Sequence, residues 1–474
     1  MPTMTINGRA AATHAEFDVL NPATGKVYTQ APDATREQVD EAMTAAADAF
    51  DSWRRDEDLR RRTLTALSAA VRDATPELAE ILAEENGKPL GLGGTEGLVG
   101  SAWCDYYAGL ELPGEVLRDD DGATVEVLRR PLGVVGAITP WNMPIGLAFF
   151  KIAPALRAGN TMVLKPSPFT PVSTLRLGEV LRDALPPGVL NIVSGGDDVG
   201  RWVAGHPVPR KISFTGSVEA GRAVNTAAAA DLKRVTLELG GNDPAILLDD
   251  VDVAAVAEGL FWTAFFNNGQ ACALVKRVYA AEAIYADLVE ALAEVARRVR
   301  VGDPTDGATQ LGSLATRPQF ERVSELVEHA LAHGATAVAG GVALDGDGLF
   351  FAPTILTGAD DGLRIVDEEQ FGPALPVLPF TDEADAVRRA NATGFGLGAS
   401  VWSADLERGA ALARQLDAGT TWVNTHASLS PDAPFGGLKW SGLGVENGPW
   451  GLHAYTDIQV LHRNRGVAGP PGAA

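Results

Sequence analysis

Hydrophobic and polar residues follow a helical period in the first part of the chain. From Thr35 to Gly87, apolar residues recur every three or four positions, which predicts amphipathic helices. Thr35 and Gln38 fit a capping box at the start of the first one. In "TPELAEILAEENGKP" we expect a further helix that begins with Thr75 as its N-cap and Pro76 in its first turn, and that ends at Gly87.

Short, continuously apolar segments then replace the long periodic ones. Two strands around an Asp-Gly turn are predicted between Val116 and Arg130. Five apolar runs follow, separated by segments of helical period such as "STLRLGEVLRDAL". These runs are "GVVGAITP", "TMVLKP", "VLNIVSG", "KISFTGS" and "RVTLELGG". Strands that are apolar on both faces and alternate with helices indicate a parallel sheet in an α/β fold.

A second α/β series begins after a break near Gly240–Gly241. Its helices are expected at about 253–266, 282–300 and 319–333, and its strands near "TILTG", "ALPVLPF", "ASVWS" and "TTWVN". "AYTDIQVLHRNR" predicts one more strand, and "GVAGPPGAA" predicts a frayed tail.

Size and composition then limit the possible functions. A chain of 474 residues is too long for one core, so two or three domains are expected. The net charge of −22 argues against nucleic acid and anionic membranes as partners. The N-terminus lacks the basic and apolar regions of a secretion signal. Two cysteines, Cys104 and Cys272, are too few for a disulfide framework, so we expect a cytoplasmic protein.

Two short motifs give only weak evidence for a dinucleotide site and a metal site. "GFGLGA", from Gly394 to Ala399, loosely fits a dinucleotide fingerprint, but it follows a helical segment and does not open a helix after a strand. His329 and His333 stand four residues apart, as metal ligands on a helix can. No cluster of cysteine and histidine completes such a site, so no metal is expected.

Cys272 lies in an unusual setting for a free thiol. In "FFNNGQACALVKR", Gly269 permits close backbone approach, small residues flank the cysteine, and Lys276 and Arg277 add positive charge nearby. A buried structural thiol and a catalytic nucleophile both fit this setting. Cys104, beside two aromatic residues, is expected in the core.

Two further polar residues follow predicted strands. Glu238 lies at the end of the apolar strand predicted in "RVTLELGGNDPA", and Asn142 lies in the proline-bounded turn "TPWNMPI". A carboxylate at the carboxyl end of a parallel sheet is either a paired structural ion or a base with a shifted pKa. The amide is either a turn residue or a donor to an oxyanion.

Taken together, these motifs resemble the aldehyde dehydrogenase superfamily over nearly the whole chain. The resemblance rests on their order and spacing, including the 34 positions from Glu238 to Cys272. The matching segments are "NPATGKV", "PWNMP", "GNTMVLKPS", "FTGS", "LELGG", "GQAC", "EEQFGP" and "PFGGLKWSG".

The resemblance implies a mechanism for three residues. Cys272 would attack the aldehyde, and the amide of Asn142 with the backbone N–H of Cys272 would hold the oxyanion. Loss of hydride to the nicotinamide would leave a thioester, which water activated by Glu238 would hydrolyse to an acid. A free thiol has a pKa of roughly 8.5, so only a few per cent is thiolate at neutral pH unless the site lowers that pKa.

The implied cofactor is NAD, and NADP stays open. Many NAD-preferring relatives have a glutamate three residues after the lysine of "LKPS", where this chain has Pro168. A carboxylate there would repel the 2′-phosphate of NADP. The cofactor-binding residues that the resemblance implies are Lys165, Ser167, Gly216, Ser217, Gly221, Glu369, Phe371 and Trp141.

A roomy apolar tunnel is implied for the substrate, because Gly146 and the two alanines replace bulkier residues common in relatives. We therefore expect apolar medium-chain or aryl aldehydes. The implied pocket residues are Met143, Gly146, Phe150, Ala271, Ala273, His426, Leu429 and Phe435.

The family fold implies an α/β architecture with a Rossmann-type cofactor domain (1–112 and 132–240), an α/β catalytic domain (241–453) and a small β oligomerisation arm (113–131 and 454–474). Unpaired arm edges suggest a homodimer or homotetramer. Two alternatives remain: an enzyme that passes the acyl group to coenzyme A, which Glu238 opposes, and a non-catalytic crystallin-like protein, which the intact catalytic groups oppose.

Overall fold

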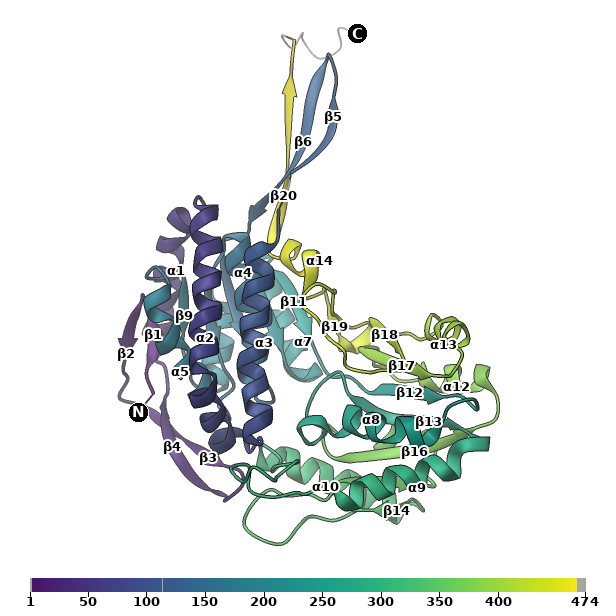
Figure 1. The fold of residues 1–474 in the computed structure, drawn as a ribbon. Helices are drawn as coiled ribbons and strands as arrows, with labels where there is room; N and C mark the ends of the chain where they lie inside the picture. Colours follow the sequence, from purple (N-terminus) through teal and green to yellow (C-terminus); the bar gives the residue numbers. More distant parts are fainter. Residues whose placement is uncertain (1, 113, 467–474) are drawn as a thin grey trace.

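The five apolar runs predicted as strands form the centre of one sheet in the computed structural model, which describes residues 2–112 and 114–466 (Figure 1). They pair in parallel, as expected for strands linked by helices. The full order is β19 (Gly442–Leu443), β11 (Arg234–Glu238), β10 (Lys211–Thr215), β7 (Val134–Ile138), β8 (Thr161–Lys165), β9 (Leu190–Ile192), β1 (Met4–Ile6) and β2 (Arg9–Ala11).

The second series forms a separate sheet, mostly parallel, at the other side of the molecule (Figure 1). Its order is β14 (Thr336–Ala339), β15 (Thr354–Thr357), β16 (Ala374–Phe380), β13 (Val275–Ala281), β12 (Asp243–Leu247), β17 (Gly398–Trp402) and β18 (Thr420–Val423). "GFGLGA" leads into β17 and opens no helix, as its sequence context predicted.

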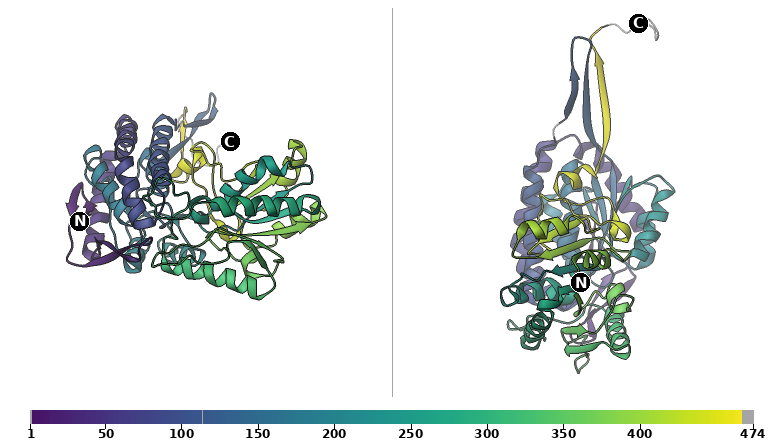
Figure 2. Two further views of the ribbon diagram at one scale, coloured as in Figure 1. Left: turned by 60° about the horizontal axis from the view of Figure 1, so that its bottom comes forward. Right: turned by 90° about the vertical axis from the view of Figure 1, so that its right-hand side faces the viewer.

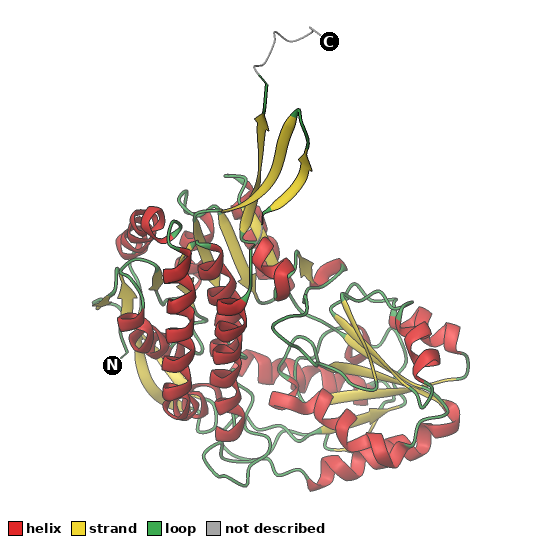
Figure 3. Ribbon diagram, turned by 45° about the horizontal axis from the view of Figure 1, so that its top comes forward, coloured by secondary structure: helices red, strands yellow, loops and turns green. Residues whose placement is uncertain are grey.

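Helices pack around both sheets (Figure 3). Those around the first sheet are α1 (Arg36–Trp53), α2 (Glu57–Asn86), α3 (Leu90–Gly109), α4 (Pro144–Ala158), α5 (Val172–Leu181), α6 (Asp197–Gly205), α7 (Val218–Ala229) and α14 (Gly448–His453). Those around the second are α8 (Val253–Phe265), α9 (Glu282–Arg298), α10 (Arg317–Ala332), α11 (Arg364–Asp367), α12 (Glu383–Ala390) and α13 (Leu406–Ala413). None of the helices in the described ranges is both long and apolar enough to cross a membrane.

The predicted hairpin and the last strand project together from the body as an arm (Figures 1 and 2). β6 (Ala123–Pro131) pairs antiparallel with β5 (Glu115–Asp119) on one side and with β20 (Thr456–Asn464) on the other. The predicted frayed tail lies outside the described residues from position 467 onward.

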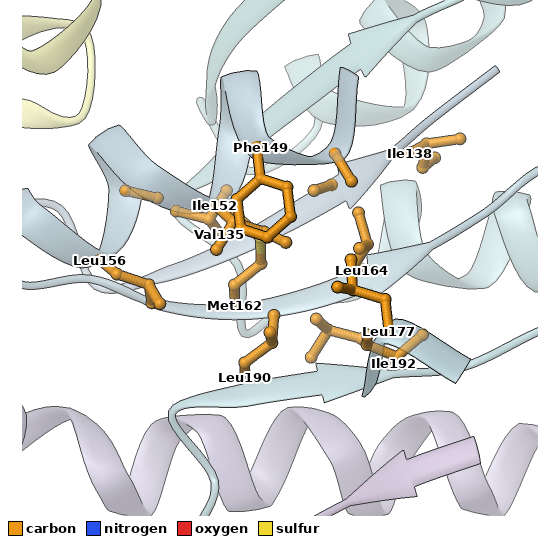
Figure 4. Close-up of a cluster of buried hydrophobic side chains, with 14 of the residues drawn as sticks. Val135, Ile138, Phe149, Ile152, Leu156, Met162, Leu164, Leu177, Leu190 and Ile192 are labelled. Carbon is orange, nitrogen blue, oxygen red and sulfur yellow. The ribbon is translucent and has the colours of Figure 1, made fainter. Parts of the chain in front are cut away.

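Each sheet has its own buried apolar cluster. In the first, Phe149 and Ile152 of α4 pack against Val135 of β7 and Met162 of β8 (Figure 4). Cys104 is fully buried in this cluster, as its aromatic neighbours predicted. These cores give the strands rigid positions, so the loops at the strand ends can hold functional groups.

One predicted helix start is wrong. α2 continues through Thr75 and Pro76 as one 30-residue helix. Pro76 has no N–H to donate to the carbonyl of Arg72, four residues earlier, and the Thr75 hydroxyl donates to a different carbonyl, Val71 O, at 2.8 Å. The helix therefore continues with one backbone hydrogen bond fewer. The predicted end holds, because Gly87 takes a left-handed φ of 76°. The short N-terminal strands, including hairpin β3 (Glu16–Asn21) and β4 (Lys26–Pro32), were not predicted.

Candidate functional site

The three candidate groups come from different elements that meet between the two sheets. Glu238 is the last residue of β11, Asn142 follows β7, and Cys272 precedes β13. β7 and β11 both pair in parallel with β10, so their carboxyl ends lie at one edge. Asn142 and Cys272 both border the same two cavities, and Glu238 borders one of them.

Cys272 follows a turn with a strained backbone. Asn267, Asn268 and Gly269 have positive φ values of 50°, 57° and 72°. A side chain on Gly269 would come within 2.3 Å of Gly372 O, so the predicted close backbone approach is confirmed. Left-handed backbone at residues other than glycine costs free energy and persists only where surrounding contacts impose it.

Buried amide side chains impose that turn. Gln270 Nε2 donates to Asn267 O at 3.0 Å, and Gln270 Oε1 accepts from Ala315 N at 2.9 Å. Asn268 Nδ2 donates to Gly312 O at 2.7 Å. The loop before Cys272 is therefore bound to neighbouring segments on several sides.

Asn142 keeps one donor for a ligand. Its Nδ2 donates to Gln270 O at 3.0 Å, which uses one of the two amide N–H bonds. The residue is 3% exposed and borders both cavities. The second N–H can therefore reach an oxygen in the space beside Cys272.

Glu238 is a buried carboxyl group that lies beside the thiol of Cys272. It is 2% exposed, and neither oxygen has a hydrogen-bond partner among the described residues. Burial raises the pKa of Glu238 to about 8, and the adjacent thiol of Cys272 opposes part of this rise. A carboxyl group with a pKa near neutrality and free oxygens is suited to exchange protons with water.

The surroundings raise the pKa of Cys272, so they do not increase the thiolate fraction. Burial is the largest cause, and the carboxyl groups of Glu238, Glu369 and Asp243 add to it. Of the two cations expected nearby, Lys276 interacts with the thiol, but its pKa is itself lowered by burial. Attack by this sulfur therefore requires a base to take its proton.

Arg277 makes its hydrogen bonds away from the thiol, which corrects the expectation that it adds positive charge beside Cys272. Its guanidinium donates to Ala390 O at 2.6 Å and to Tyr279 OH at 2.9 Å, while its Nε donates to Asn242 O. Successive side chains of a strand point to opposite faces, so neighbours 276 and 277 in β13 diverge.

An apolar cavity of about 410 Å³ opens beside Cys272. The structure places on it all eight residues assigned to the pocket from sequence: Met143, Gly146, Phe150, Ala271, Ala273, His426, Leu429 and Phe435. Sequence reasoning missed Val99, Trp103, Leu147, Trp262, Thr263, Phe266, Leu274 and Ala427. Trp103 stacks on Phe150 with centroids 4.5 Å apart, and Val99 lies one turn earlier on α3; both read as core positions in sequence because their helix is apolar.

His426 borders this cavity with a buried side chain, and its Nε2 has no hydrogen-bond partner among the described residues. Nδ1 lies 2.9 Å from Ser400 Oγ, and Nε2 lies 3.4 Å from Asp243 Oδ2. The ring also packs against Trp422.

A second cavity of about 220 Å³ lies on the other side of the thiol. Five of the residues assigned to the cofactor line it: Trp141, Gly216, Ser217, Glu369 and Phe371. The other three do not. Lys165 Nζ donates to Pro166 O, Ser167 Oγ accepts from Phe169 N, and Gly221 is buried inside α7. Gln319 and Arg322, which also line it, were missed.

The walls of this second cavity suit a nucleotide. Ser217 caps α7 by accepting from Ala220 N, so the start of this 12-residue helix lies at the cavity. Gly240 has no space for a side chain, because a Cβ would lie 2.1 Å from Glu369 Oε2. Glu369 Oε1 accepts from Gly241 N at 3.0 Å, and the rings of Trp141 and Phe371 meet edge to face at 5.4 Å. A carboxylate, a helix N-terminus and flat rings fit the ribose, phosphate and ring of a dinucleotide.

Comparisons with known proteins independently support the resemblance that the sequence motifs indicate. The model of the aldehyde dehydrogenase family matches residues 9–461. Retinaldehyde dehydrogenase 3 from Homo sapiens is 39% identical over 467 residues, covering 96% of this chain and 91% of that protein. Phenylacetaldehyde dehydrogenase from Pseudomonas fluorescens is 39% identical over 470 residues, covering 95% and 93%. The structure of the NAD+ complex of an aldehyde dehydrogenase from Bacillus cereus has a TM-score of 0.95 and 35% identity, covering 98% of this chain and 96% of that one.

Proposed function

Because this chain belongs to the aldehyde dehydrogenase family and so carries out NAD(P)-dependent oxidation of aldehydes to acids, we propose that its substrates are bulky apolar aldehydes, aryl or medium-chain. In the overall reaction, aldehyde, water and NAD(P)+ give acid, NAD(P)H and a proton. One observation carries the proposal: Cys272 and Asn142 form the common wall between an apolar cavity and a polar one. A carbonyl carbon entering from the apolar side meets the sulfur there.

Cys272 is the proposed nucleophile. Its sulfur adds to the aldehyde carbon, and the thiol proton passes to Glu238, the carboxyl group beside it. The free N–H of Asn142 and the backbone N–H of Cys272 then hold the oxyanion of the thiohemiacetal. Each donor contributes about 3 kcal/mol in comparable sites.

The polar cavity is the proposed cofactor site. Glu369 would bind the nicotinamide ribose, and Ser217 and the start of α7 would face the pyrophosphate. Lys165 and Ser167 lie outside this cavity, and the family resemblance assigns them to the adenosine end of the cofactor. When bound, NAD(P)+ supplies the acceptor for the hydride that leaves the substrate carbon.

Glu238 is the proposed base for the second half of the reaction. The acyl group remains on Cys272 as a thioester. Glu238 first releases the thiol proton to solvent and then takes a proton from the water that attacks the thioester; this proton returns to the departing sulfur as the acid is released. No partner holds the carboxyl oxygens, so both are free to bind that water. This role favours a free acid over an acyl-coenzyme A product.

The cavity supports the proposed substrate class. About 410 Å³ lined by aromatic and aliphatic side chains is typical of sites that enclose a mostly apolar ligand. The relatives named for retinaldehyde and phenylacetaldehyde act on aldehydes of this kind.

Steady-state kinetics on a panel of aldehydes test the substrate class. We expect phenylacetaldehyde and octanal to show higher kcat/KM than acetaldehyde or succinic semialdehyde, with the acid as product and no requirement for coenzyme A. Gly146→Leu should reduce kcat/KM for the bulky aldehydes by roughly tenfold or more, because a side chain there points between Val99 and Met143 of the cavity wall. Gly91→Leu, at an open position on α3, is the matched control. Highest kcat/KM for short acidic aldehydes would refute the proposed class.

Cofactor preference is tested at Pro168. Introducing Pro168→Glu should lower kcat/KM with NADP+ by roughly tenfold while leaving NAD+ similar or better, because the carboxylate would repel a 2′-phosphate and accept from ribose hydroxyls. Pro168→Ala controls for loss of the proline ring. Equal losses with both cofactors in Pro168→Glu would place position 168 away from the ribose.

The remaining sequence predictions extend this proposal. The three regions given above, with boundaries at residues 112, 131, 240 and 453, would be the cofactor domain, catalytic domain and arm. The arm exposes apolar side chains along its strands, which favours a homodimer or homotetramer; these are Val116, Leu117, Ile458, Val460 and Leu461. Two free cysteines suit a cytoplasmic location.

A further inference from the structure

A fully buried lysine approaches the site from the turn that ends α2. Gly87 reverses the chain there, and it must be glycine, because a Cβ would lie 2.0 Å from Ser313 Oγ. Lys88 then enters the interior with its side chain 0% exposed. It forms an ion pair with Glu96 of α3, whose side chain is also 0% exposed.

The ion pair contacts the backbone on both sides of the oxyanion residue. Lys88 Nζ donates to Asn142 O at 2.9 Å. Glu96 Oε2 accepts from Ile145 N at 2.9 Å and from Gly146 N at 3.0 Å. These N–H groups belong to the first turn of α4, where no intrahelical acceptor exists and the N-cap side chain makes no hydrogen bond.

The same carbonyl joins the pair to the nucleophile loop. Asn267 Nδ2 donates to Asn142 O at 3.1 Å and to Gln270 O at 3.2 Å. Gln270 O also accepts from Asn142 Nδ2. Two hydrogen-bonded carbonyls therefore set the position of the Asn142 side chain relative to Cys272.

Packing alone does not explain a buried ion pair in this place. Taking two charges out of water is costly, and apolar residues of similar volume often give equal or greater stability. Here every contact of the pair leads to the Asn142 backbone or to the helix that begins two residues later.

We propose that the Lys88–Glu96 ion pair is a positioning device that holds the free amide N–H of Asn142 at the oxyanion. This inference rests on the role proposed for Asn142. Rigid placement of a donor before the reaction is what makes it effective, because no reorganisation is then needed as charge develops.

A double-mutant cycle tests the inference. Lys88→Met alone would strand a buried charge, so the informative variant is Lys88→Met/Glu96→Gln, which is neutral and retains an acceptor for the α4 N–H groups. We expect kcat to fall by about 10- to 100-fold with KM for the aldehyde changed less than about threefold. Added to Asn142→Ala, which itself should cost about 100-fold or more, the pair of substitutions should cost less than about threefold further.

The control is Lys211→Met, which removes another buried lysine at the opposite end of β10 from the site; it should leave kcat unchanged. Thermal melting confirms that each variant is folded. Additive losses, or wild-type kcat in the folded Lys88→Met/Glu96→Gln variant, overturn the positioning role alone. Wild-type kcat in Asn142→Ala overturns the oxyanion role, and the positioning role with it. The positioning role is supported if kcat falls in Lys88→Met/Glu96→Gln, does not fall much further when Asn142→Ala is added, and is unchanged in Lys211→Met.

Discussion

Replacing Cys272 by serine should abolish aldehyde oxidation, lowering kcat by about 10⁴-fold or more. A serine hydroxyl is a far weaker acid and nucleophile than a thiol, and the surroundings that raise the pKa of Cys272 would oppose an alkoxide even more strongly. Reduced-cofactor absorbance in a stopped-flow instrument should show neither a burst nor a steady state.

The other cysteine supplies the control for this experiment. Cys104→Ala changes a thiol that lies fully buried in the core of the first sheet, so it should retain kcat and lose only stability. Iodoacetamide should inactivate the wild type and Cys104→Ala alike. Residual oxidation by Cys272→Ser at more than about 1% of the wild-type rate would contradict the assignment.

Substituting Glu238 by glutamine should separate the two halves of the reaction. The first hydride transfer should persist as a slowed burst of about one equivalent, while steady-state turnover falls by about 10²- to 10⁴-fold. The variant loses the proposed proton acceptor for both the thiol and the water, which slows the burst and stops hydrolysis. The burst persists because removal of the carboxylate also removes a charge that raises the pKa of the thiol. Mass spectrometry of the quenched enzyme should find the acyl group on Cys272, and full turnover in this variant would disprove the role of base.

The same carboxyl group predicts a pH dependence. Burial raises the pKa of Glu238 to about 8, so the fraction able to accept a proton is small at pH 6 and rises through pH 8. Turnover limited by thioester hydrolysis should rise across this range in the wild type, and not in Glu238→Gln. Glu85 of α2 provides a contrast: burial raises its pKa to about 7, but its carboxylate accepts from Val172 N and Ser173 N at the start of α5 and does not border either cavity beside Cys272. Glu85→Gln should leave the pH profile near 8 unchanged.

Local patterns predicted much of the fold correctly. The apolar runs that became β7, β8, β10 and β11 are recognisable because strands buried on both faces need no polar positions. The first capping box and the end of α2 at Gly87 also follow from local chemistry. The helix start at Thr75 was wrong because tertiary packing against α3, α4 and α5 outweighs the local cost of Pro76.

The sequence by itself determined which elements form, which residues are chemically competent, and which family the chain belongs to, because hydrophobic period and motif order are local properties. Only the tertiary structure decided the electrostatics: that Arg277 turns away, that the pKa of Cys272 rises, and that Glu238 has no partner. It also brought Lys88 to the Asn142 backbone. Burial and opposing charge depend on groups contributed by distant segments, and no local pattern contains them.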